Sequence, residues 1–196
     1  MKLPIHGFVL AGGRSSRMGR DKARLPFRGQ PMVEIAVTTL AALCEHVSIG
    51  GNRDDLHEFA PIVHETRCDE GPVAGIEAGM LACESAWALF VPVDLPLLPA
   101  AFLRAWGEAV LARPATRASY ISSGARPHPA LCLIRRDCAV EVSQAIESGK
   151  RSVRGVLEAL AGLWEVDAGN FVDRAVSDRW LTNVNTPQEL DRAERL

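Results

Sequence analysis

The chain has 196 residues, of which 47% are hydrophobic and 23% charged, and its formal net charge is −2. These values are ordinary for a globular protein and allow a proper core, so we expect one α/β domain over residues 1–196. The mild negative charge argues against bulk nucleic-acid binding, which usually leaves a basic surface. No apolar run approaches a membrane-spanning length, and the first residues lack a long apolar signal segment.

The cysteine pattern points to a compartment rather than to a site. There are five cysteines, an odd number, and no CxxC pair. Such spacing predicts neither a disulfide framework nor a zinc site. We therefore expect reduced thiols and a cytoplasmic protein without a membrane or nucleic-acid partner.

Apolar runs alternate with helical patterns in the first half, which is typical of βαβ units around a mainly parallel sheet. Pro31 stands at a favourable position for starting a helix. The expected strands cover about 5–10, 47–49, 62–63 and 87–91, and the expected helices about 32–43, 75–83 and 100–111.

The second half is less regular. Strands are expected at 120–122 and 130–134 around a turn at 124–127, and helices at 138–147 and 152–160. The last helix has a capping box, with Thr186 as N-cap, Pro187 at the first position and Glu189 at the third.

The segment from Leu10 to Lys22 is the most informative part of the chain. An apolar strand ends at Gly12 and Gly13, and the cations Arg14, Arg17 and Lys22 follow within a few positions. Glycine allows close backbone approach to a ligand, and free N–H groups with clustered positive charge suit a polyanion such as a triphosphate. The spacing matches neither the P-loop nor the dinucleotide fingerprint. It therefore predicts a different phosphate cradle, although a lone glycine pair is most often an ordinary turn.

Two charged residues are candidates for the chemistry itself. Lys22 is either a solvated surface charge or a point charge on the phosphates that stabilises the transition state. Its neighbour Asp21 is as well explained by a plain ion pair. Asp94 follows a buried strand, where a carboxylate can ligate Mg²⁺ beyond the carboxyl end of a parallel sheet. The alternative for Asp94 is an Asp turn before Pro96, and only the combination with the glycine loop favours the metal.

Four further residues have a functional and a structural interpretation. Glu65 could hold a ribose or a base, or belong to a solvated acidic loop. His128 lies between two prolines, and a substrate contact and a structural role are about equally favoured. Asn183 and Asn185 are expected to flank a strand end with both side chains on one side. They could bind a polar acceptor substrate or tie down the loop before the final helix.

Taken together, these segments resemble the molybdenum cofactor guanylyltransferases, a branch of the nucleotidyltransferases. The matching segments run in family order across nearly the whole chain: Leu10-Ala11-Gly12-Gly13, Ser16-Arg17-Met18-Gly19, Asp21-Lys22, Gly71-Pro72-Val73-Ala74-Gly75, Pro92-Val93-Asp94-Leu95-Pro96, His128-Pro129 and Asn183-Val184-Asn185-Thr186-Pro187. The resemblance implies a three-layer Rossmann-like fold with a mainly parallel, mixed central sheet.

The resemblance also implies a reaction, in which GMP passes from GTP to the terminal phosphate of molybdopterin and pyrophosphate is released. Mg²⁺ is the implied cofactor, and transient contact with molybdenum cofactor biosynthesis proteins or molybdoenzyme chaperones is implied. On this basis the nucleotide and metal side comprises Leu10, Ala11, Gly12, Gly13, Arg17, Lys22, Asn52, Glu65 and Asp94, with Asp94 on the metal. The acceptor side comprises His128, Asn183 and Asn185. Catalysis would rest on in-line positioning and charge neutralisation, because the attacking group is already an anion.

The chain departs from the family pattern near the base. Gly50-Gly51 stand where some members have an asparagine, with Asn52 following, and Glu65 stands where an aspartate is common. Alternatives are a cytidylyltransferase for the same cofactor, which the Gly12-Gly13 form disfavours, and a nucleotidyltransferase for a sugar phosphate or phospholactate. A non-catalytic binder of a phosphorylated cofactor is the alternative from another class.

Overall fold

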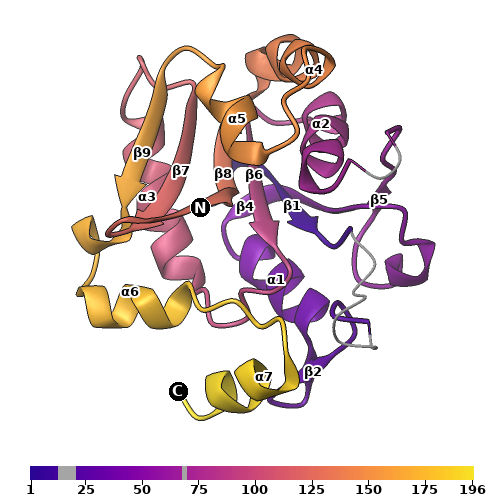
Figure 1. The fold of residues 1–196 in the computed structure, drawn as a ribbon, viewed down its shortest axis with the longest axis vertical. Coiled ribbons are helices and arrows are strands. Elements are labelled where there is room, and N and C mark those ends of the chain that lie inside the picture. The colour runs from indigo at the N-terminus through magenta and orange to yellow at the C-terminus, as the bar shows by residue number, and fades with distance from the viewer. Residues whose placement is uncertain (13–20, 68–69) are drawn as a thin grey trace.

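The computed structural model describes residues 1–12, 21–67 and 70–196, and a seven-stranded sheet forms its centre (Figure 1). The strand order is β5-β4-β1-β6-β8-β7-β9. A separate hairpin pairs β2 (Pro26–Phe27) with β3 (Gln30–Pro31). The strands of the sheet are β1 (Leu3–Leu10), β4 (Cys44–Gly50), β5 (Ile62–Val63), β6 (Trp87–Pro92), β7 (Ala118–Ser123), β8 (Arg126–Arg135) and β9 (Leu163–Asp167).

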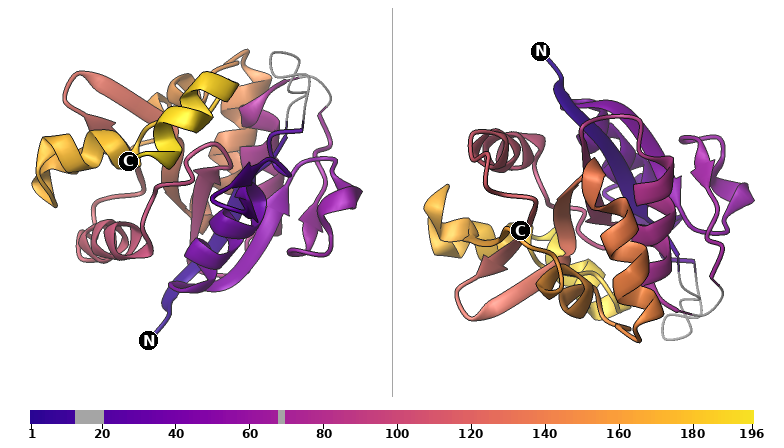
Figure 2. Two further views of the ribbon diagram at one scale, coloured as in Figure 1. Left: turned by 90° about the horizontal axis from the view of Figure 1, so that it is seen from below. Right: turned by 90° about the horizontal axis from the view of Figure 1, so that it is seen from above.

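Helices cover both faces of this sheet, as Figure 2 shows. They are α1 (Met32–Ala41), α2 (Pro72–Ala82), α3 (Ala100–Leu111), α4 (Ala139–Glu147), α5 (Val153–Glu158), α6 (Arg174–Trp180) and α7 (Pro187–Glu194). Short 3-10 turns lie at Asp54–Leu56, Arg136–Cys138 and Ala168–Asn170. Among the described residues, no helix combines the length and apolar character needed to cross a membrane.

Two separate cores follow from the alternation of side chains along each strand. In β1, Ile5 and Val9 belong to the core that contains α1 and α3, whereas Phe8 and Leu10 belong to the core that contains α2, α4 and α5. The protein therefore has three layers, helices–sheet–helices, as expected. Six of the seven strands share one direction, and β8 is antiparallel to both of its neighbours, which makes the sheet mainly parallel but mixed.

Four parallel strands end at one edge of the sheet. Leu10 of β1 pairs with Gly50 of β4 and with Pro92 of β6, and Gly50 pairs with Val63 of β5. In open α/β sheets, ligands bind beyond the carboxyl ends of the strands. The residues that follow these four strands are therefore the ones to inspect for a site.

Most expected elements are present, and the differences have local causes. The helix expected from residue 75 begins at Pro72, because Gly71 takes φ 66° as its N-cap and Pro72 occupies the first turn. The turn expected at 124–127 is shorter, since β8 already begins at Arg126 and Gly124 takes φ 58°. Strand β9 and helix α6 were not expected. The edge strand β9 is only partly buried and pairs with β7 alone, so its apolar pattern is weak.

Candidate active site

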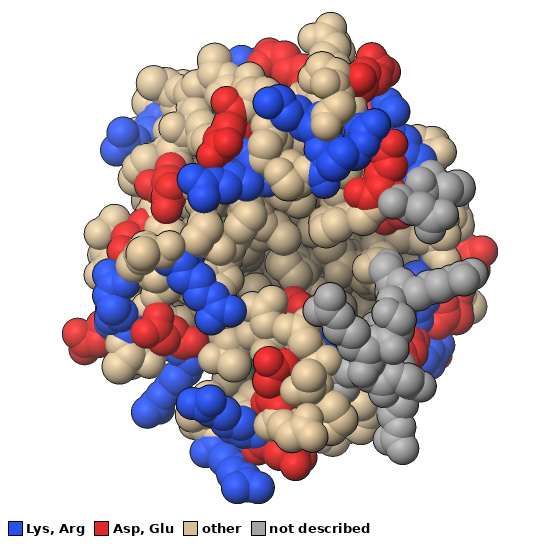
Figure 3. Space-filling view, in the orientation of Figure 1, with Lys and Arg blue, Asp and Glu red and all other residues tan. Residues whose placement is uncertain are grey.

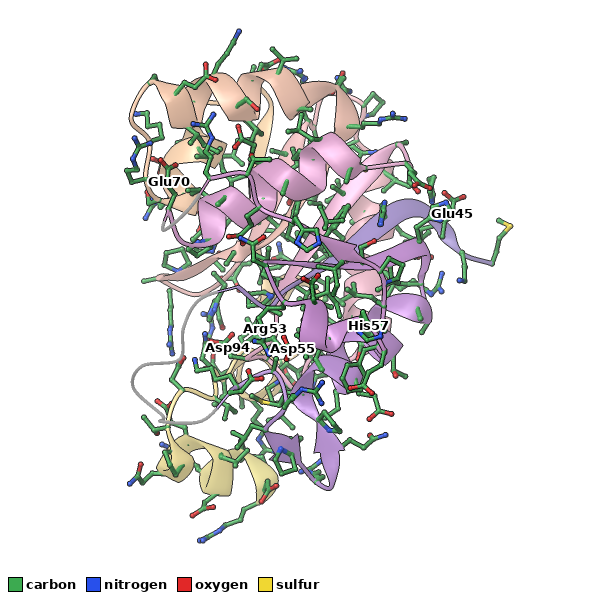
Figure 4. The ribbon with its side chains drawn as sticks, turned by 90° about the vertical axis from the view of Figure 1, so that its right-hand side faces the viewer. Glu45, Arg53, Asp55, His57, Glu70 and Asp94 are labelled. Atoms are coloured by element: carbon green, nitrogen blue, oxygen red, sulfur yellow. The ribbon has the colours of Figure 1, made fainter. Side chains whose placement is uncertain are left out.

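The carboxyl edge of the sheet brings together residues that follow different strands. Gly12 follows β1, Arg53 follows β4, Glu65 follows β5 and Asp94 follows β6. Figure 4 shows Arg53, Asp55 and Asp94 toward this end of the molecule, whereas Glu45, near the start of β4, lies at the opposite end. The parallel topology thus gathers one charged or glycine position from each strand.

Asp94 is fixed by its own backbone and by the segment before α7. Its carbonyl accepts a hydrogen bond from Val184 N at 2.9 Å, and its Oδ2 accepts one from Asn183 Nδ2 at 3.3 Å. Its second carboxylate oxygen, Oδ1, is buried and has no hydrogen-bond partner among the described residues. A buried carboxylate oxygen without a donor is costly, which marks Oδ1 as an atom that a cation would satisfy.

Lys22 extends its ammonium group to the same place. Nζ lies 3.7 Å from Asp94 Oδ2 and donates a hydrogen bond to Asn185 Oδ1. The side chains of Lys22 and Asp94 are 21% and 16% exposed, so the pair is largely shielded but open on one side. Such a cation can neutralise charge on a phosphate that enters from that side.

The segment with Asn183 and Asn185 has a different local structure from the one expected. It is not the end of a strand: residues 182–185 are irregular, because Val184 N bonds to Asp94 O instead of joining the sheet. The capping box behind it is present, and Thr186 Oγ1 accepts from Glu189 N at 3.2 Å. Glu189 Oε2 accepts from Asn185 N at 2.7 Å, so the start of α7 also fixes Asn185.

Glu65 lies against Gly12, which follows β1, and Gly75 of α2. A Cβ atom at Gly12 would lie 2.7 Å from Glu65 Oε1, so a larger residue would displace this carboxylate. Gly51 takes φ 135°, and a Cβ there would approach Gly12 N to 3.1 Å. Asn52 Oδ1 accepts from Glu65 N at 3.1 Å, and burial raises the pKa of the Glu65 carboxyl. Asn52 thus acts on the Glu65 backbone and leaves the carboxylate facing the cradle.

A pocket of about 490 Å³ adjoins this cluster on the β8 side. Its lining includes His128, Asn183, Arg126, Arg151 and Arg154. Figure 3 shows a hollow near the middle of this face, with basic side chains along its upper side. Burial, together with the charge of Arg126, lowers the pKa of His128, so the imidazole is neutral at pH 7. A partly apolar pocket with basic residues suits an anionic organic ligand.

The shape of β8 places His128 at this pocket. Tyr120 pairs with Cys132, but the next residue, Ile121, pairs with His128, so residues 129–131 are bulged out of register. Pro129 has no N–H to donate to the sheet, and prolines are found at such bulges. Because β8 runs antiparallel to β6, its first residues reach past the carboxyl end of β6 and toward the site.

The structure brings several predicted site residues into direct contact. The ion pair of Lys22 with Asp94 joins the hydrogen bonds of Asn185 to Lys22 and of Asn183 to Asp94 into one cluster, although the resemblance put both asparagines on the acceptor side. The ends of β1, β4 and β5 hold five more of the predicted residues: Leu10, Ala11, Gly12, Asn52 and Glu65. Gly13 and Arg17, also predicted for the cradle, lie outside the described residues.

Sequence reasoning missed three arginines. Arg53 binds Asp21 through both terminal nitrogens, and Arg126 and Arg151 line the pocket. Arg53 directly follows Asn52, and Arg126 stands two residues before His128, so adjacency to predicted residues was the available signal. For Arg151, which follows Gly149-Lys150, the sequence has no comparable motif nearby.

The donor set fits a hard divalent cation. Among the described residues, no cluster of three or more His, Cys, Asp or Glu side chains could hold a metal by itself. Mg²⁺, however, is commonly held by one or two carboxylates and completed by substrate phosphates and waters. Asp94, whose Oδ1 has no partner in the described part of the chain, meets this requirement.

Comparison with known proteins places this chain in a family. Residues 7–163 match the model described as "MobA-like NTP transferase domain". The chain belongs to this family. As a MobA-like NTP transferase it is a nucleotidyltransferase, and its glycine cradle, Lys22 and Asp94 all lie within the matched region.

Relatives of this MobA-like NTP transferase have consistent names. A molybdenum cofactor guanylyltransferase from Serratia proteamaculans is 32% identical over 161 residues, covering 79% of this chain and 80% of the relative. A protein of the same name from Pseudomonas paraeruginosa is 30% identical over 199 residues, covering 98% and 96%. The crystal structure of molybdopterin-guanine dinucleotide biosynthesis protein A from Archaeoglobus fulgidus has a TM-score of 0.77 at 21% identity, covering 97% of both chains.

Proposed function

We propose that this MobA-like NTP transferase transfers GMP from GTP to the terminal phosphate of molybdopterin, releasing pyrophosphate and forming molybdopterin guanine dinucleotide. The observation that carries the proposal is the contact of Lys22 with Asp94 and Asn185 at the carboxyl edge of the sheet, beside a basic pocket. The names of the relatives in two bacterial genera support it.

The reaction needs positioning more than proton transfer. A terminal phosphate oxygen of the acceptor attacks the α-phosphorus of GTP, and the bond to the oxygen bridging the α- and β-phosphorus breaks. The electron pair of that bond leaves with pyrophosphate. Because the attacking oxygen is already an anion, no strong general base is required, and in-line orientation with charge neutralisation supplies the rate.

The nucleotide occupies the ends of β1, β4 and β5 in this proposal. The phosphates would lie beyond Leu10 and Ala11, whose backbone is bonded to the neighbouring strands, and would face the backbone from Gly12 onward. The Glu65 carboxylate would face the nucleoside, where Asn52 fixes the Glu65 backbone. Lys22 neutralises negative charge that develops between the α-phosphate and the leaving pyrophosphate.

Asp94 would hold Mg²⁺ through its unpartnered Oδ1, with phosphates completing the coordination. When bound, the ion supplies further charge neutralisation on the phosphates. Asn183 orients the Asp94 carboxylate by donating to the other oxygen, Oδ2. Removal of this carboxylate therefore removes both the metal ligand and the partner of Lys22.

The acceptor occupies the pocket that His128 and Asn183 line. Its volume of about 490 Å³ suits a ring system of pterin size, and the neutral imidazole of His128 can donate or accept a hydrogen bond. Asn183 lines this pocket and bonds to Asp94, which supports an arrangement with the acceptor phosphate next to the nucleotide phosphates.

Calorimetric titration of GTP, CTP, ATP and UTP, with and without Mg²⁺, tests the first half of the proposal. Selective GTP binding that Mg²⁺ strengthens is the expected result, and pyrophosphate release on addition of molybdopterin then tests the second half. Preference for CTP would move the substrate to the cytidylyl branch. Binding that ignores Mg²⁺, with no pyrophosphate release, would favour a non-catalytic cofactor binder.

A further inference from the structure

Arg53 forms two fork-shaped ion pairs behind the site. Its Nη1 donates to Asp21 Oδ1 at 3.0 Å and its Nη2 donates to Asp21 Oδ2. On its other edge, Nε donates to Asp55 Oδ1 and Nη2 to Asp55 Oδ2, both at 2.8 Å. Two bidentate carboxylate contacts on one guanidinium define its orientation far better than a single surface ion pair does.

Asp21 passes this constraint to the backbone of Lys22. Asp21 Oδ1 also accepts a hydrogen bond from Ala23 N at 3.1 Å, which closes a turn around Lys22. On the other side, Leu25 N donates to Lys22 O at 3.1 Å, and Val33 N of α1 donates to Ala23 O at 2.9 Å. The Lys22 backbone is therefore fixed between α1 and the Arg53–Asp21 pair.

The position of this backbone matters because lysine has a long, flexible side chain. The Lys22 ammonium reaches Asp94 and Asn185 only if its backbone starts from the right place. Arg53 itself contacts neither of these residues through any bond that the described part of the chain shows. It does follow Asn52, which binds the backbone of Glu65, so the nucleoside side and the phosphate side share one loop.

We infer that Arg53 is a positioning residue for Lys22: it holds Asp21, and through Asp21 the turn from which Lys22 reaches the phosphates. This inference rests on the proposed function. It makes Arg53 a determinant of the transfer step rather than of nucleotide affinity, because Arg53 acts on the lysine and not on the ligand.

Arg24 provides a matched control. It is an arginine of the same surface network, bonded to Asp55 at 3.4 Å and to Glu58 at 2.9 Å, and it does not bond to Asp21. Its side chain is 44% exposed, against 22% for Arg53. Exposed ion pairs of this kind contribute little, so Arg24→Ala is expected to leave turnover within about twofold of the wild type.

The test compares Arg53→Ala, Arg53→Lys, Asp21→Ala, Arg53→Ala/Asp21→Ala and Arg24→Ala. For Arg53→Ala we expect kcat to fall about 10- to 100-fold, the cost of misplacing a group by about 1 Å, while the Kd of Mg·GTP by calorimetry changes less than about threefold. The kcat of the double variant should fall no further than that of Arg53→Ala alone, since the two substitutions remove the same Arg53–Asp21 contact. Arg53→Lys keeps the charge but not the two-pronged contact, so its kcat should lie between those of the wild type and Arg53→Ala.

Hydrogen exchange provides a readout that does not depend on turnover. The Ala23 amide should lose protection in Arg53→Ala and keep it in Arg24→Ala, because Asp21 Oδ1 accepts that N–H. If the wild type transfers no nucleotide, the proposed function fails, and this exchange measurement still decides whether Arg53 fixes the turn. Unchanged kcat and protection in Arg53→Ala would overturn the inference. Additive losses of kcat in the double variant would also overturn it. The same holds if Arg53→Lys loses nucleotide affinity and kcat equally while its melting temperature is unchanged.

Discussion

The two halves of the central sheet contribute differently to the site. In the β5-β4-β1-β6 half all strands are parallel and end at one level, and a residue of the proposed site follows each strand end. In the β8-β7-β9 half, β8 is reversed and its register with β7 jumps by three residues. In the proposed function the first half provides backbone and charge for phosphates, and the second, with β8 extending past β6, forms one wall of the pocket.

Under the proposed function, this difference lets one sheet hold two substrates at separate places. Parallel strands place residues at fixed positions along one edge, which suits the repeated charges of a triphosphate. A bulged antiparallel strand reaches beyond that edge and turns side chains sideways, which suits an organic ring. Asn183 lies where the halves meet, since it lines the pocket and bonds to Asp94.

The largest effect is expected from the parallel half at Asp94. Asp94→Asn keeps the shape but removes the carboxylate charge that would bind Mg²⁺ and pair with Lys22. We expect kcat to fall by about 10³-fold, at the upper end for a single charge-stabilising group, with an unchanged melting temperature. Pyrophosphate release at limiting Mg²⁺ measures it, with the exposed Asp191→Asn as control. Wild-type activity in Asp94→Asn would remove Asp94 from the metal site.

Lys22→Ala tests the role of the parallel half a second time. Loss of this ammonium removes the charge beside the phosphates, and we expect kcat to fall by about 10²-fold. Single-turnover kinetics at saturating GTP and acceptor measure the effect, and the exposed Lys2→Ala is the control. Kinetics close to the wild type would make Lys22 an ordinary surface-type ion pair.

The β8 half is tested at His128. His128→Ala opens the pocket wall without touching the Lys22–Asp94 cluster. We expect the KM for the acceptor to rise about tenfold, equivalent to about 1.4 kcal/mol, with the Kd of GTP unchanged. His57→Ala is the control, since His57 is exposed and is not among the residues that line the pocket. Equal losses for GTP and acceptor would contradict a division of labour between the halves.

The smallest effect concerns stability in the parallel half. His6 of β1 is 4% exposed, accepts from Glu84 N through Nδ1 and therefore bonds through Nε2–H to Ser48 Oγ at 3.0 Å. Burial lowers the pKa of this imidazole below its usual 6.5. Stability is then fully present above about pH 6.5 and falls as pH drops toward the lowered value, because the unfolded chain binds more protons in that window.

Urea unfolding of the wild type and of His6→Gln between pH 5 and 8 measures this dependence. The free energy of unfolding of the wild type should decline more steeply toward pH 5 than that of the variant. Parallel curves would show that other groups cause the acid sensitivity.

Much of the fold and part of the site could be predicted from local patterns. The helix over 100–111 appears with those bounds, and Thr186 caps α7 as its spacing predicts, because both depend on neighbours within one turn. The mainly parallel sheet follows from the alternation of strands and helices, whereas its mixed character, which is due to the reversed β8, was implied only by the family resemblance. Strand β9 was missed because a partly buried edge strand has few apolar residues to reveal it in the sequence. Its position depends on pairing with β7.

By itself, the sequence determined the glycine cradle after β1, the lysine that follows it and the carboxylate after β6, since backbone freedom, charge and strand ends are local properties. Tertiary structure alone decided that Asn185 contacts Lys22 from 163 positions away and that Arg53 holds Asp21. It also assembled the pocket from segments near residues 72, 92, 128, 151 and 183. Those contacts depend on where the strands end in space, which only the packing of the whole sheet fixes.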